Sequence, residues 1–342
     1  MKGVAKVAPG EGNVELIDVA EPEATAGHVV LEVKTAGVCG TDLHIYHDEY
    51  PSNPPVIMGH EVAGIVADIG NNVSRCRTGD RVTSETYFHV CGSCTLCRDG
   101  FPNQCPERKS IGSGVHGAFT KYVLVPEQNI HHLPENVDVT AGALTEPLAC
   151  CVHALELTRV EPDETVVVTG PGAIGLLTSQ VVKAAGAKVI VIGTSADEAR
   201  LELATSLGAD LTLNAQAVDV QAIIHEMTDR LGADVVFECS GAGPAAQTCL
   251  DLVRRKGRYA QVGLFGKPIQ WDLEQVCFKE VEVSGSFATV PSAWRKALKM
   301  MASGKVQTKP IISDSMPITA WQQAFDTFER RDGVKIVLTP EA

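Results

Sequence analysis

The chain has 342 residues, of which 44% are hydrophobic and 21% charged, a composition typical of a folded protein with two domains. Its formal net charge of −13 argues against nucleic acid or an anionic membrane surface as a partner, and no apolar run approaches the roughly 18 residues of a membrane helix. Eleven cysteines, with no apolar signal segment after Met1, fit metal ligation in a reducing compartment better than disulfides, so we expect a cytoplasmic protein.

The first part of the chain, up to about residue 148, is rich in glycine, proline and short β-branched runs such as residues 29–33. This pattern predicts many short strands joined by turns.

In this part of the chain, four cysteines separated by two, two and seven residues form one group: Cys91, Cys94, Cys97 and Cys105. Such spacing lets one loop place four thiolates around a structural zinc ion. The alternatives are a disulfide scaffold, typical of small secreted chains, and an iron–sulfur cluster, for which a suitably placed proline and a second cysteine set are missing.

From about residue 160 the pattern changes to apolar strands that alternate with helices. The expected strands are residues 166–168, 189–192, 211–213, 235–237, 259–262 and 281–284, and the expected helices are residues 176–185, 220–231, 293–303 and 319–331. Continuous apolar strands alternating with helices are typical of a parallel sheet that is covered on both faces. We therefore expect a doubly wound α/β domain after the β-rich part.

A glycine-rich turn follows the first of these strands and opens a helix. Its residues are Gly170, Pro171, Gly172, Ala173, Ile174 and Gly175. Between a strand and a helix, this pattern predicts a dinucleotide whose pyrophosphate lies at the helix N-terminus. A glycine turn that only packs the helix on the strand is the alternative.

The end of the second strand bears on the choice of cofactor. Residues Gly193, Thr194 and Ser195 include no carboxylate to bond the adenosine ribose, and Asp197 is expected to be an acidic cap of the next helix. Without an acid there is room for a 2′-phosphate, which the two hydroxyls and Arg200 could bind. We therefore expect NAD(P), with a slight preference for NADP.

A second group of candidate metal ligands is more scattered: Cys39, His60, Glu61 and Glu146. A catalytic zinc needs about three protein ligands and an open position, and it stabilises an alkoxide at neutral pH. Alone, Cys39 reads as a small core residue and His60 as a loop histidine.

The sequence around these residues resembles the zinc-dependent medium-chain alcohol and polyol dehydrogenases, in the branch of sorbitol and threonine dehydrogenases. The matching motifs are residues 37–42, residues 59–61, Gly64, Gly70, Val73, residues 79–82 and residues 146–154. They follow the order of the family, in which the cysteine group comes before the motif at 146–154 and the glycine turn comes after it. The resemblance implies a GroES-like, mainly β catalytic domain and a Rossmann cofactor domain. The catalytic domain would comprise residues 1–148 and 287–342, and the cofactor domain residues 149–286.

The resemblance also implies roles for individual residues. Cys39 and His60 would bind the catalytic zinc, with Glu61 as an exchangeable third ligand, and Glu146 would bind the metal or hold its water. Thr41 would pass the substrate proton.

Further roles remain open between two alternatives each. His44 would extend the proton relay or be a surface histidine, and Tyr50 and Phe119 would line the substrate site or belong to the core. Six residues that end or follow late strands would line the nicotinamide side: Cys239, Ser240, Gly263, Leu264, Phe287 and Ala288. Cys150 and Cys151 are expected to pack a helix.

Two departures from the family pattern bear on the substrate. Sorbitol dehydrogenases carry an Arg-Tyr pair where this chain has Thr289 and Val290, and threonine dehydrogenases carry a histidine where it has Phe88, with His89 one residue out of register. We expect oxidation of a secondary alcohol, a polyol or sugar alcohol, in a homodimer or homotetramer. L-threonine 3-dehydrogenase and a dinucleotide-binding protein without activity are the alternatives.

Overall fold

The computed structural model describes residues 1–340, which form two compact units. The first unit comprises Met1–Ala149, Thr289–Ala302 and the chain from Thr308 onward, and the second comprises Cys150–Ala288 and Ser303–Gln307. The expected division at 148/149 and return at 287 lie within two residues of these limits. Residues 303–307, which we expected in the catalytic part, cluster with the second unit instead.

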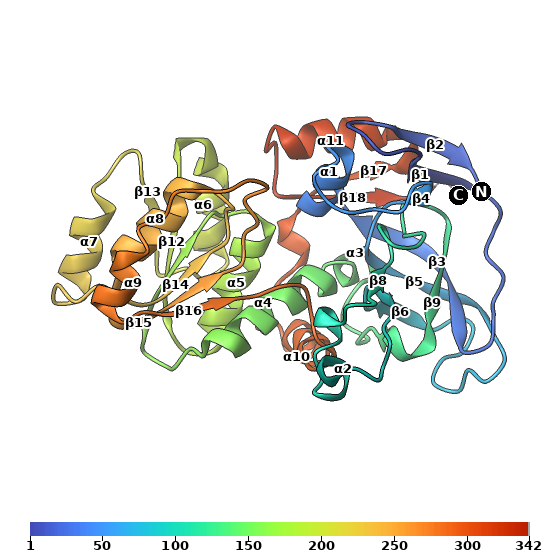
Figure 1. Ribbon diagram of the computed structural model, residues 1–342, viewed down its shortest axis with the longest axis horizontal. Helices are drawn as coiled ribbons and strands as arrows, with labels where there is room; N and C mark the ends of the chain where they lie inside the picture. The colour runs from blue at the N-terminus through green and yellow to red at the C-terminus, as the bar shows by residue number, and fades with distance from the viewer. Residues whose placement is uncertain (341–342) are drawn as a thin grey trace. The chain divides into compact units, whose positions relative to one another are not determined.

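The first unit consists mainly of short strands, as expected (Figure 1). They are β1 (Lys2–Lys6), β2 (Val14–Asp18), β3 (His28–Gly37), β4 (Val56–Ile57), β5 (Glu61–Ile69), β6 (Arg81–Ser84), β7 (Tyr87–His89), β8 (Lys109–Ser110), β9 (Tyr122–Pro126), β10 (Ile130–His132), β17 (Ile312–Pro317) and β18 (Lys335–Thr339). The largest sheet has the order β10-β6-β5-β3-β18-β17, with β9 also paired to β3. Strand β3 therefore has partners from three distant parts of the chain.

This sheet positions the first candidate site. Strands β3 and β5 pair antiparallel with Gly37 opposite Glu61, and β18 pairs with β3 with Val337 opposite Gly37. Residues just after β3 and just before β5 are therefore neighbours, and the start of β18 comes close to both. Buried aliphatic side chains of these strands form the core beneath them, together with Phe119 and with Trp321 and Phe325 of the helix at 321–329.

The α-helices that lie wholly within the first unit have 4 to 12 residues. They are α1 (Gly40–Tyr46), α2 (Thr95–Arg98), α3 (Val139–Gly142), α10 (Pro291–Ala302) and α11 (Trp321–Glu329), while α4 (Thr145–Thr158) begins in this unit and continues into the second. The expected helices 293–303 and 319–331 correspond to α10 and α11.

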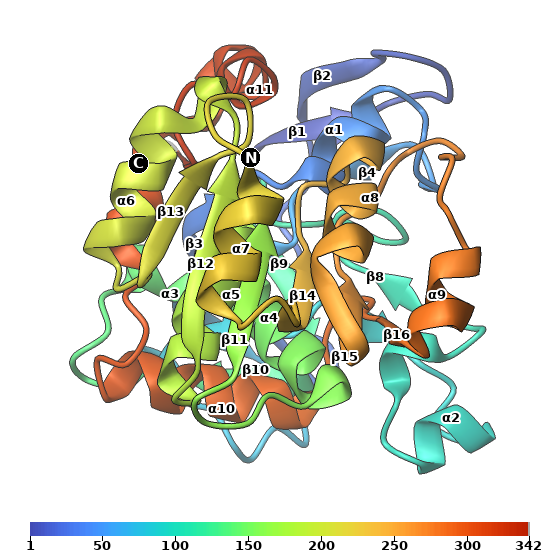
Figure 2. The same ribbon diagram turned by 90° about the vertical axis from the view of Figure 1, so that its left-hand side faces the viewer.

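The second unit is the doubly wound α/β domain that the alternating pattern predicted. Its strands are β11 (Thr165–Thr169), β12 (Lys188–Gly193), β13 (Leu211–Asn214), β14 (Ala233–Glu238), β15 (Val253–Gln261) and β16 (Glu282–Gly285). All pairs are parallel, and the order is β13-β12-β11-β14-β15-β16, which can be followed from left to right in Figure 2. Since the strand order reverses direction at β11 and β14, this fold places a ligand crevice at the carboxyl ends of these strands.

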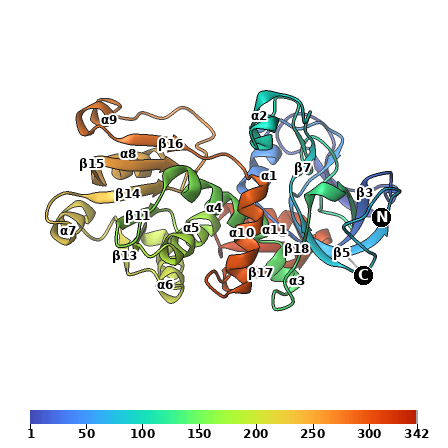
Figure 3. The same ribbon diagram turned by 90° about the horizontal axis from the view of Figure 1, so that it is seen from below.

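Five helices connect the strands: α5 (Ala173–Ala184), α6 (Glu198–Ser206), α7 (Val220–Met227), α8 (Gly243–Leu252) and α9 (Glu274–Lys279). Helices α5 and α6 cover one face of the sheet, and α7 and α8 cover the other (Figure 3). Helices α8 and α9 were not expected from the sequence, and the expected helix 220–231 ends at Met227. No helix within residues 1–340 is both long and apolar enough to cross a lipid bilayer.

Candidate metal and cofactor sites

Three of the predicted metal ligands lie together in the first unit. Cys39 follows β3 and caps α1, whereas His60 and Glu61 stand at the start of β5. One ligand atom from each, the Cys39 sulfur, a His60 ring nitrogen and a Glu61 carboxylate oxygen, lie within 4.8 Å of one another. The pairing of β3 with β5 thus brings together residues that the sequence separates by about twenty positions.

Two glycines make room for this arrangement. A Cβ on Gly37 would lie 2.0 Å from Glu61 Oε2, so the carboxylate occupies the space that a side chain on β3 would fill. Gly59 has φ +87°, and a Cβ there would lie 2.4 Å from the ring of Phe119. Each glycine lets a bulky neighbour approach the backbone beside His60 and Glu61.

Asp42, which the sequence placed in the motif without a role, supports two of these residues. Its Oδ2 accepts a hydrogen bond of 2.9 Å from the backbone N–H of Cys39, and its Oδ1 lies 3.8 Å from His60 Nδ1. Burial raises the pKa of the Asp42 carboxyl above its ordinary value, against the opposing effects of His60 and the Cys39 N–H. Burial alone would lower the pKa of His60, but the Cys39 sulfur and the Asp42 charge outweigh it and hold that pKa well above its ordinary value.

Lys335, a residue that sequence reasoning missed, supports Glu61, the third residue of the group. Its Nζ donates to Glu61 Oε1 at 2.7 Å and to the carbonyl oxygen of Val38 at 2.8 Å. Burial works to lower the pKa of Lys335, but the charge of Glu61 outweighs it and raises that pKa above its ordinary value. Both side chains of this ion pair are almost completely buried.

Glu146 lies in the first turn of α4 and is 6% exposed. It is outside the group formed by Cys39, His60 and Glu61, although its charge raises the pKa of both His60 and Lys335. The structure therefore places Glu146 within electrostatic reach of the site, and its role as a ligand or a water holder stays a prediction.

The residues predicted for the proton path and the substrate wall have different surroundings. The hydroxyl of Thr41 lies 3.8 Å from the Cys39 sulfur, directly beside the ligand group. His44 pairs with Glu49 at 2.7 Å on the partly exposed side of α1. Tyr50 is half-buried, whereas Phe119 is completely buried and packs against Phe325, so the structure favours the core role for Phe119.

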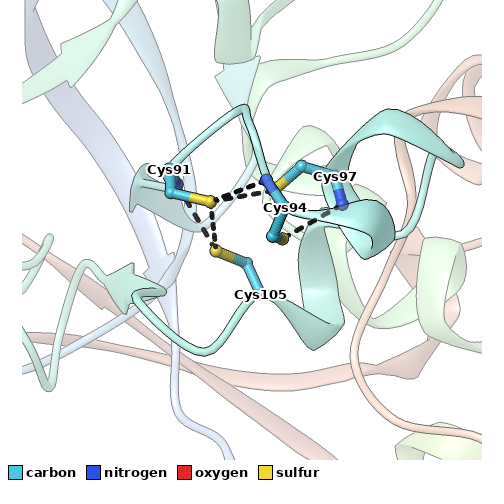
Figure 4. A group of neighbouring side chains, drawn as sticks. All are labelled: Cys91, Cys94, Cys97 and Cys105. Carbon is cyan, nitrogen blue, oxygen red and sulfur yellow. Dashed lines mark hydrogen bonds between the residues drawn. The ribbon is translucent and has the colours of Figure 1, made fainter.

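The four cysteines of the other group gather around a common centre (Figure 4). The sulfur of Cys91 lies 3.6 Å from that of Cys105 and 4.0 Å from that of Cys97. Backbone N–H groups point at three sulfurs, which is how a loop stabilises thiolates. The N–H groups of Cys94 and Ser93 lower the pKa of Cys91 to about 6, whereas burial raises the pKa of Cys97 to about 12.

In the second unit, the glycine-rich turn joins β11 to α5 as expected. Gly170 has φ +84°, and a Cβ on it would lie 2.6 Å from Ser240. A Cβ on Gly175 would lie 1.9 Å from the carbonyl oxygen of Gly170, whereas one on Gly172 would meet nothing within 4 Å. The turn is therefore tightly packed on its inner side, and it is open at Gly172, where Ala173 and Ile174 begin α5.

The tip of β12 is occupied by a network around Asp197. Its Oδ2 accepts hydrogen bonds from the backbone N–H and the hydroxyl of Thr194 at 3.0 and 2.7 Å, and Arg200 lies 3.4 Å from its Oδ1. Asp197 stands at the start of α6, as the sequence predicted, but its side chain does not cap that helix and instead completes a capping box with Thr194 in the turn before it. Ser195 is exposed beside Gly193, and its hydroxyl accepts a hydrogen bond from Asn214.

Glu238, at the end of β14, was not predicted, and it organises the residues expected on the nicotinamide side. Its carboxylate is completely buried and accepts hydrogen bonds from the N–H groups of Ser240 and Gly241 and from the side chain of Gln261. A Cβ on Gly263 would lie 2.3 Å from Gly241 N, so these two turns touch. An acid at the end of an apolar strand, three residues before Gly241, was the available signal for this residue.

The other residues predicted near the nicotinamide vary in exposure. The thiol of Cys239 lies 3.8 Å from the Thr178 hydroxyl, and burial raises its pKa. Leu264 is half exposed, and Phe287 and Ala288 belong to the second unit rather than to the returning catalytic part. Cys151 is completely buried in α4, with its thiol 3.4 Å from the Ile174 carbonyl oxygen, as expected for helix packing.

The two departures from the family pattern also have a structural basis. Thr289 is completely buried, where it exchanges hydrogen bonds with the Tyr87 hydroxyl and accepts one from Trp294 Nε1 at 2.9 Å. On β7, His89 is exposed, while the half-buried Phe88 packs against the core. The structure therefore keeps His89, the histidine one residue out of register, on the exposed side of β7.

Comparisons with known proteins agree with these two units. Residues 25–135 match the family model of the alcohol dehydrogenase GroES-like domain, and residues 173–303 match that of the zinc-binding dehydrogenases. The chain is 42% identical to a sorbitol dehydrogenase of Halalkalibacterium halodurans, over 99% of both chains. It is 41% identical to a D-arabitol-phosphate dehydrogenase of Enterococcus avium, over 99% of this chain and 97% of that protein. A zinc-binding dehydrogenase from Sinorhizobium meliloti, solved bound to NADP, superposes with a TM-score of 0.92 at 32% identity, over 99% of both chains.

Proposed function

Because the chain belongs to the zinc-dependent medium-chain alcohol dehydrogenase family, we propose that it oxidises a polyol or sugar alcohol at a secondary hydroxyl to a ketone, or catalyses the reverse reduction. It is a zinc-dependent oxidoreductase that uses NAD(P), with a GroES-like first unit and a Rossmann-type second unit. The observation that carries the proposal is the grouping of Cys39, His60 and Glu61 within 4.8 Å. The sorbitol and arabitol-phosphate dehydrogenases among its relatives support a polyol as substrate.

The residues of this group fit a zinc ion. Thiolate, imidazole and carboxylate are the ligands of catalytic zinc sites, and Glu61 Oε2 is buried without a hydrogen-bond partner among the described residues. When bound, zinc would supply Lewis acidity that lowers the pKa of the substrate hydroxyl. Cys39, His60 and Glu61 would hold it, and Asp42 would orient the His60 ring.

The remaining roles follow from the positions of the side chains. Thr41 would accept the substrate proton, since its hydroxyl lies beside the Cys39 sulfur, and His44 on the next turn of α1 would carry it toward solvent. The turn from Gly170 to Gly175 would hold the pyrophosphate of the dinucleotide, whose nicotinamide accepts the hydride when bound. Glu146 would act on the metal site through its charge.

Metal analysis tests the catalytic site directly. We expect two zinc ions per chain, of which Cys39→Ala loses one together with turnover, while Cys150→Ala, a matched change of a cysteine outside both groups, keeps both. A single zinc that survives Cys39→Ala would refute the site. The same result would revive the alternative of a dinucleotide-binding protein without activity.

For the cofactor, we propose a slight preference for NADP over NAD. The tip of β12 offers no free carboxylate to the ribose, because Asp197 is engaged with Thr194 and Arg200, and the Sinorhizobium relative was solved with NADP. Ser195→Asp would place an acid at the exposed tip and should shift the ratio of kcat/KM toward NAD, while Ser195→Asn should not. A wild-type enzyme that already strongly prefers NAD would refute this proposal.

The substrate is best tested by a screen of polyols, polyol phosphates, simple secondary alcohols and L-threonine with both cofactors. Polyol phosphates deserve inclusion because the guanidinium of Arg108 lies 3.5 Å from the Tyr50 hydroxyl, where it could bind a phosphate. L-Threonine remains the main alternative substrate, although the exposure of His89 gives it no support. Highest kcat/KM on L-threonine would overturn the polyol proposal.

A homo-oligomer is also proposed. Strand β16 is the last in its sheet, so one of its edges has no strand partner within residues 1–340; its Val283 is an exposed apolar residue, as are Leu273 and Phe278 at α9. Such an edge invites pairing with a second copy of the chain. Light scattering should give a dimer or tetramer, and Val283→Lys should shift the protein toward the monomer.

We further propose a cytoplasmic location, in keeping with eleven free cysteines.

A further inference from the structure

Lys335, at the start of β18, is a buried cation beside the proposed metal ligands. Its side chain is 3% exposed, and it lies 274 positions from its partner Glu61 in the sequence. A lysine ammonium that is removed from water is costly unless it is paired, so this residue needs Glu61 and the carbonyl oxygen of Val38. Its ring neighbour, Phe328, lies 5.9 Å away and gives no counter-charge of its own.

Strand pairing fixes the position of the lysine relative to the carboxylate. Gly37 on β3 is opposite Glu61 on one side and opposite Val337 on the other, so Lys335 reaches Glu61 past a residue without a side chain. Oε1 of Glu61 is held by Lys335, and Oε2 is buried without a hydrogen-bond partner in residues 1–340. The carboxylate is therefore already half engaged before any metal binds.

We propose that Lys335 is a positioning residue that competes with the metal for Glu61 and so keeps Glu61 an exchangeable ligand. This inference rests on the proposed catalytic zinc at Cys39, His60 and Glu61. A carboxylate shared between two cations binds each more weakly than it would bind one alone, and the effect is large in a dry environment. With zinc bound, such exchange would leave room for the alcohol, which a permanent third protein ligand bound through both oxygens would fill.

Removing the lysine charge should strengthen the hold of Glu61 on the metal. In Lys335→Met the metal becomes the main cation facing the Glu61 charge, with Cys39, Asp42 and Glu146 as the other acidic groups nearby. Glu61 should then stay on the metal, and the metal should leave more slowly. A merely structural role for Lys335 predicts the opposite, since losing a buried partner loosens the site.

The test follows zinc release from the zinc-loaded enzyme to an excess of a chromogenic chelator. Lys335→Met should slow release from this site about tenfold relative to the wild type, whereas Lys335→Arg, which keeps the charge, should stay close to the wild type. Release from Cys39→Ala gives the contribution of the four-cysteine site. If release from Lys335→Met is equal to or faster than that of the wild type, the inference is overturned while the catalytic site stands; if Cys39→Ala keeps both ions, the proposed function itself fails.

A second pair of variants covers the case in which Lys335→Met does not fold. Glu61→Gln has no carboxylate charge for the lysine to compete for, so Glu61→Gln and the double variant Glu61→Gln/Lys335→Met should release zinc at the same rate. The double variant leaves neither partner charged and should fold. A difference in release rate between these two proteins would show that Lys335 acts on the metal by another route and would overturn the inference.

Discussion

Gly175→Ala and Gly172→Ala form a matched pair that separates the packing of the dinucleotide turn from its binding of phosphate. A Cβ on Gly175 would lie 1.9 Å from the carbonyl oxygen of Gly170, about 1.5 Å short of the 3.4 Å at which ordinary contact begins. Overpacking against backbone costs about 3 kcal/mol, and the better helix propensity of alanine returns about 1 kcal/mol. The net loss of about 2 kcal/mol should lower Tm by about 4–8 °C.

Gly172→Ala should behave in the opposite way. Gly172 has φ −76° and ψ −174°, which alanine adopts readily, and its Cβ would meet nothing within 4 Å. The methyl group would enter the space proposed for the pyrophosphate, so we expect a wild-type Tm and an NADPH Kd raised about tenfold, which corresponds to about 1.4 kcal/mol. Circular dichroism melting and NADPH fluorescence titration measure both quantities. Wild-type affinity in Gly172→Ala would refute the placement of the phosphate, and a wild-type Tm in Gly175→Ala would refute the packing argument.

Three further predictions concern the first unit. Asp42→Asn keeps the shape of the side chain but removes the charge that lies 3.8 Å from His60, so zinc affinity at the catalytic site should fall about 10–100-fold in a chelator competition. Cys105→Ser should remove the other zinc and lower Tm while the NADPH Kd stays at the wild-type value; loss of cofactor binding would contradict a purely structural role. The backbone N–H of Arg77 holds the pKa of Asp80 below its ordinary value of 3.8, so the stability from Asp80 is present above about pH 4 and is lost as the pH falls further. Unfolding free energies measured by urea between pH 6 and 3 should therefore vary less in Asp80→Asn than in the wild type.

Features with a local signal could be predicted from the sequence. The strand, glycine turn and helix around Gly170–Gly175 occupy adjacent positions, and each contributes its own pattern of residues. The four cysteines also lie close in sequence, so one loop can gather their sulfurs without help from the rest of the fold. Asp197 was placed correctly at a helix start because such a position is set by neighbouring residues, although its carboxylate bonds Thr194 rather than α6.

Features that depend on strand pairing could not be predicted in this way. Strand β18 begins with a lysine, which is ordinarily a solvated residue. Only the pairing of β18 with β3 buries Lys335 and brings it to Glu61. The sequence also could not predict which face of β7 carries the His89 side chain, because a shift of one residue on a strand turns a side chain from one face to the other.

The two metal sites differ in how their buried polar groups are satisfied, and this difference fits their proposed roles. In the four-cysteine group, the protein's own backbone N–H groups bond three of the sulfurs, so the loop supplies part of what stabilises the thiolates. In the other group, Asp42 Oδ1 and Glu61 Oε2 are buried without hydrogen-bond partners among the described residues, and such atoms are rare in folded proteins. Four groups that can carry negative charge, Cys39, Asp42, Glu61 and Glu146, face only two basic side chains, Lys335 and His60, so the balance favours an additional cation. A site whose acids are left unsatisfied by the fold can change its ligands at low cost, as a catalytic metal requires, whereas a site completed by its own backbone is suited to hold one arrangement.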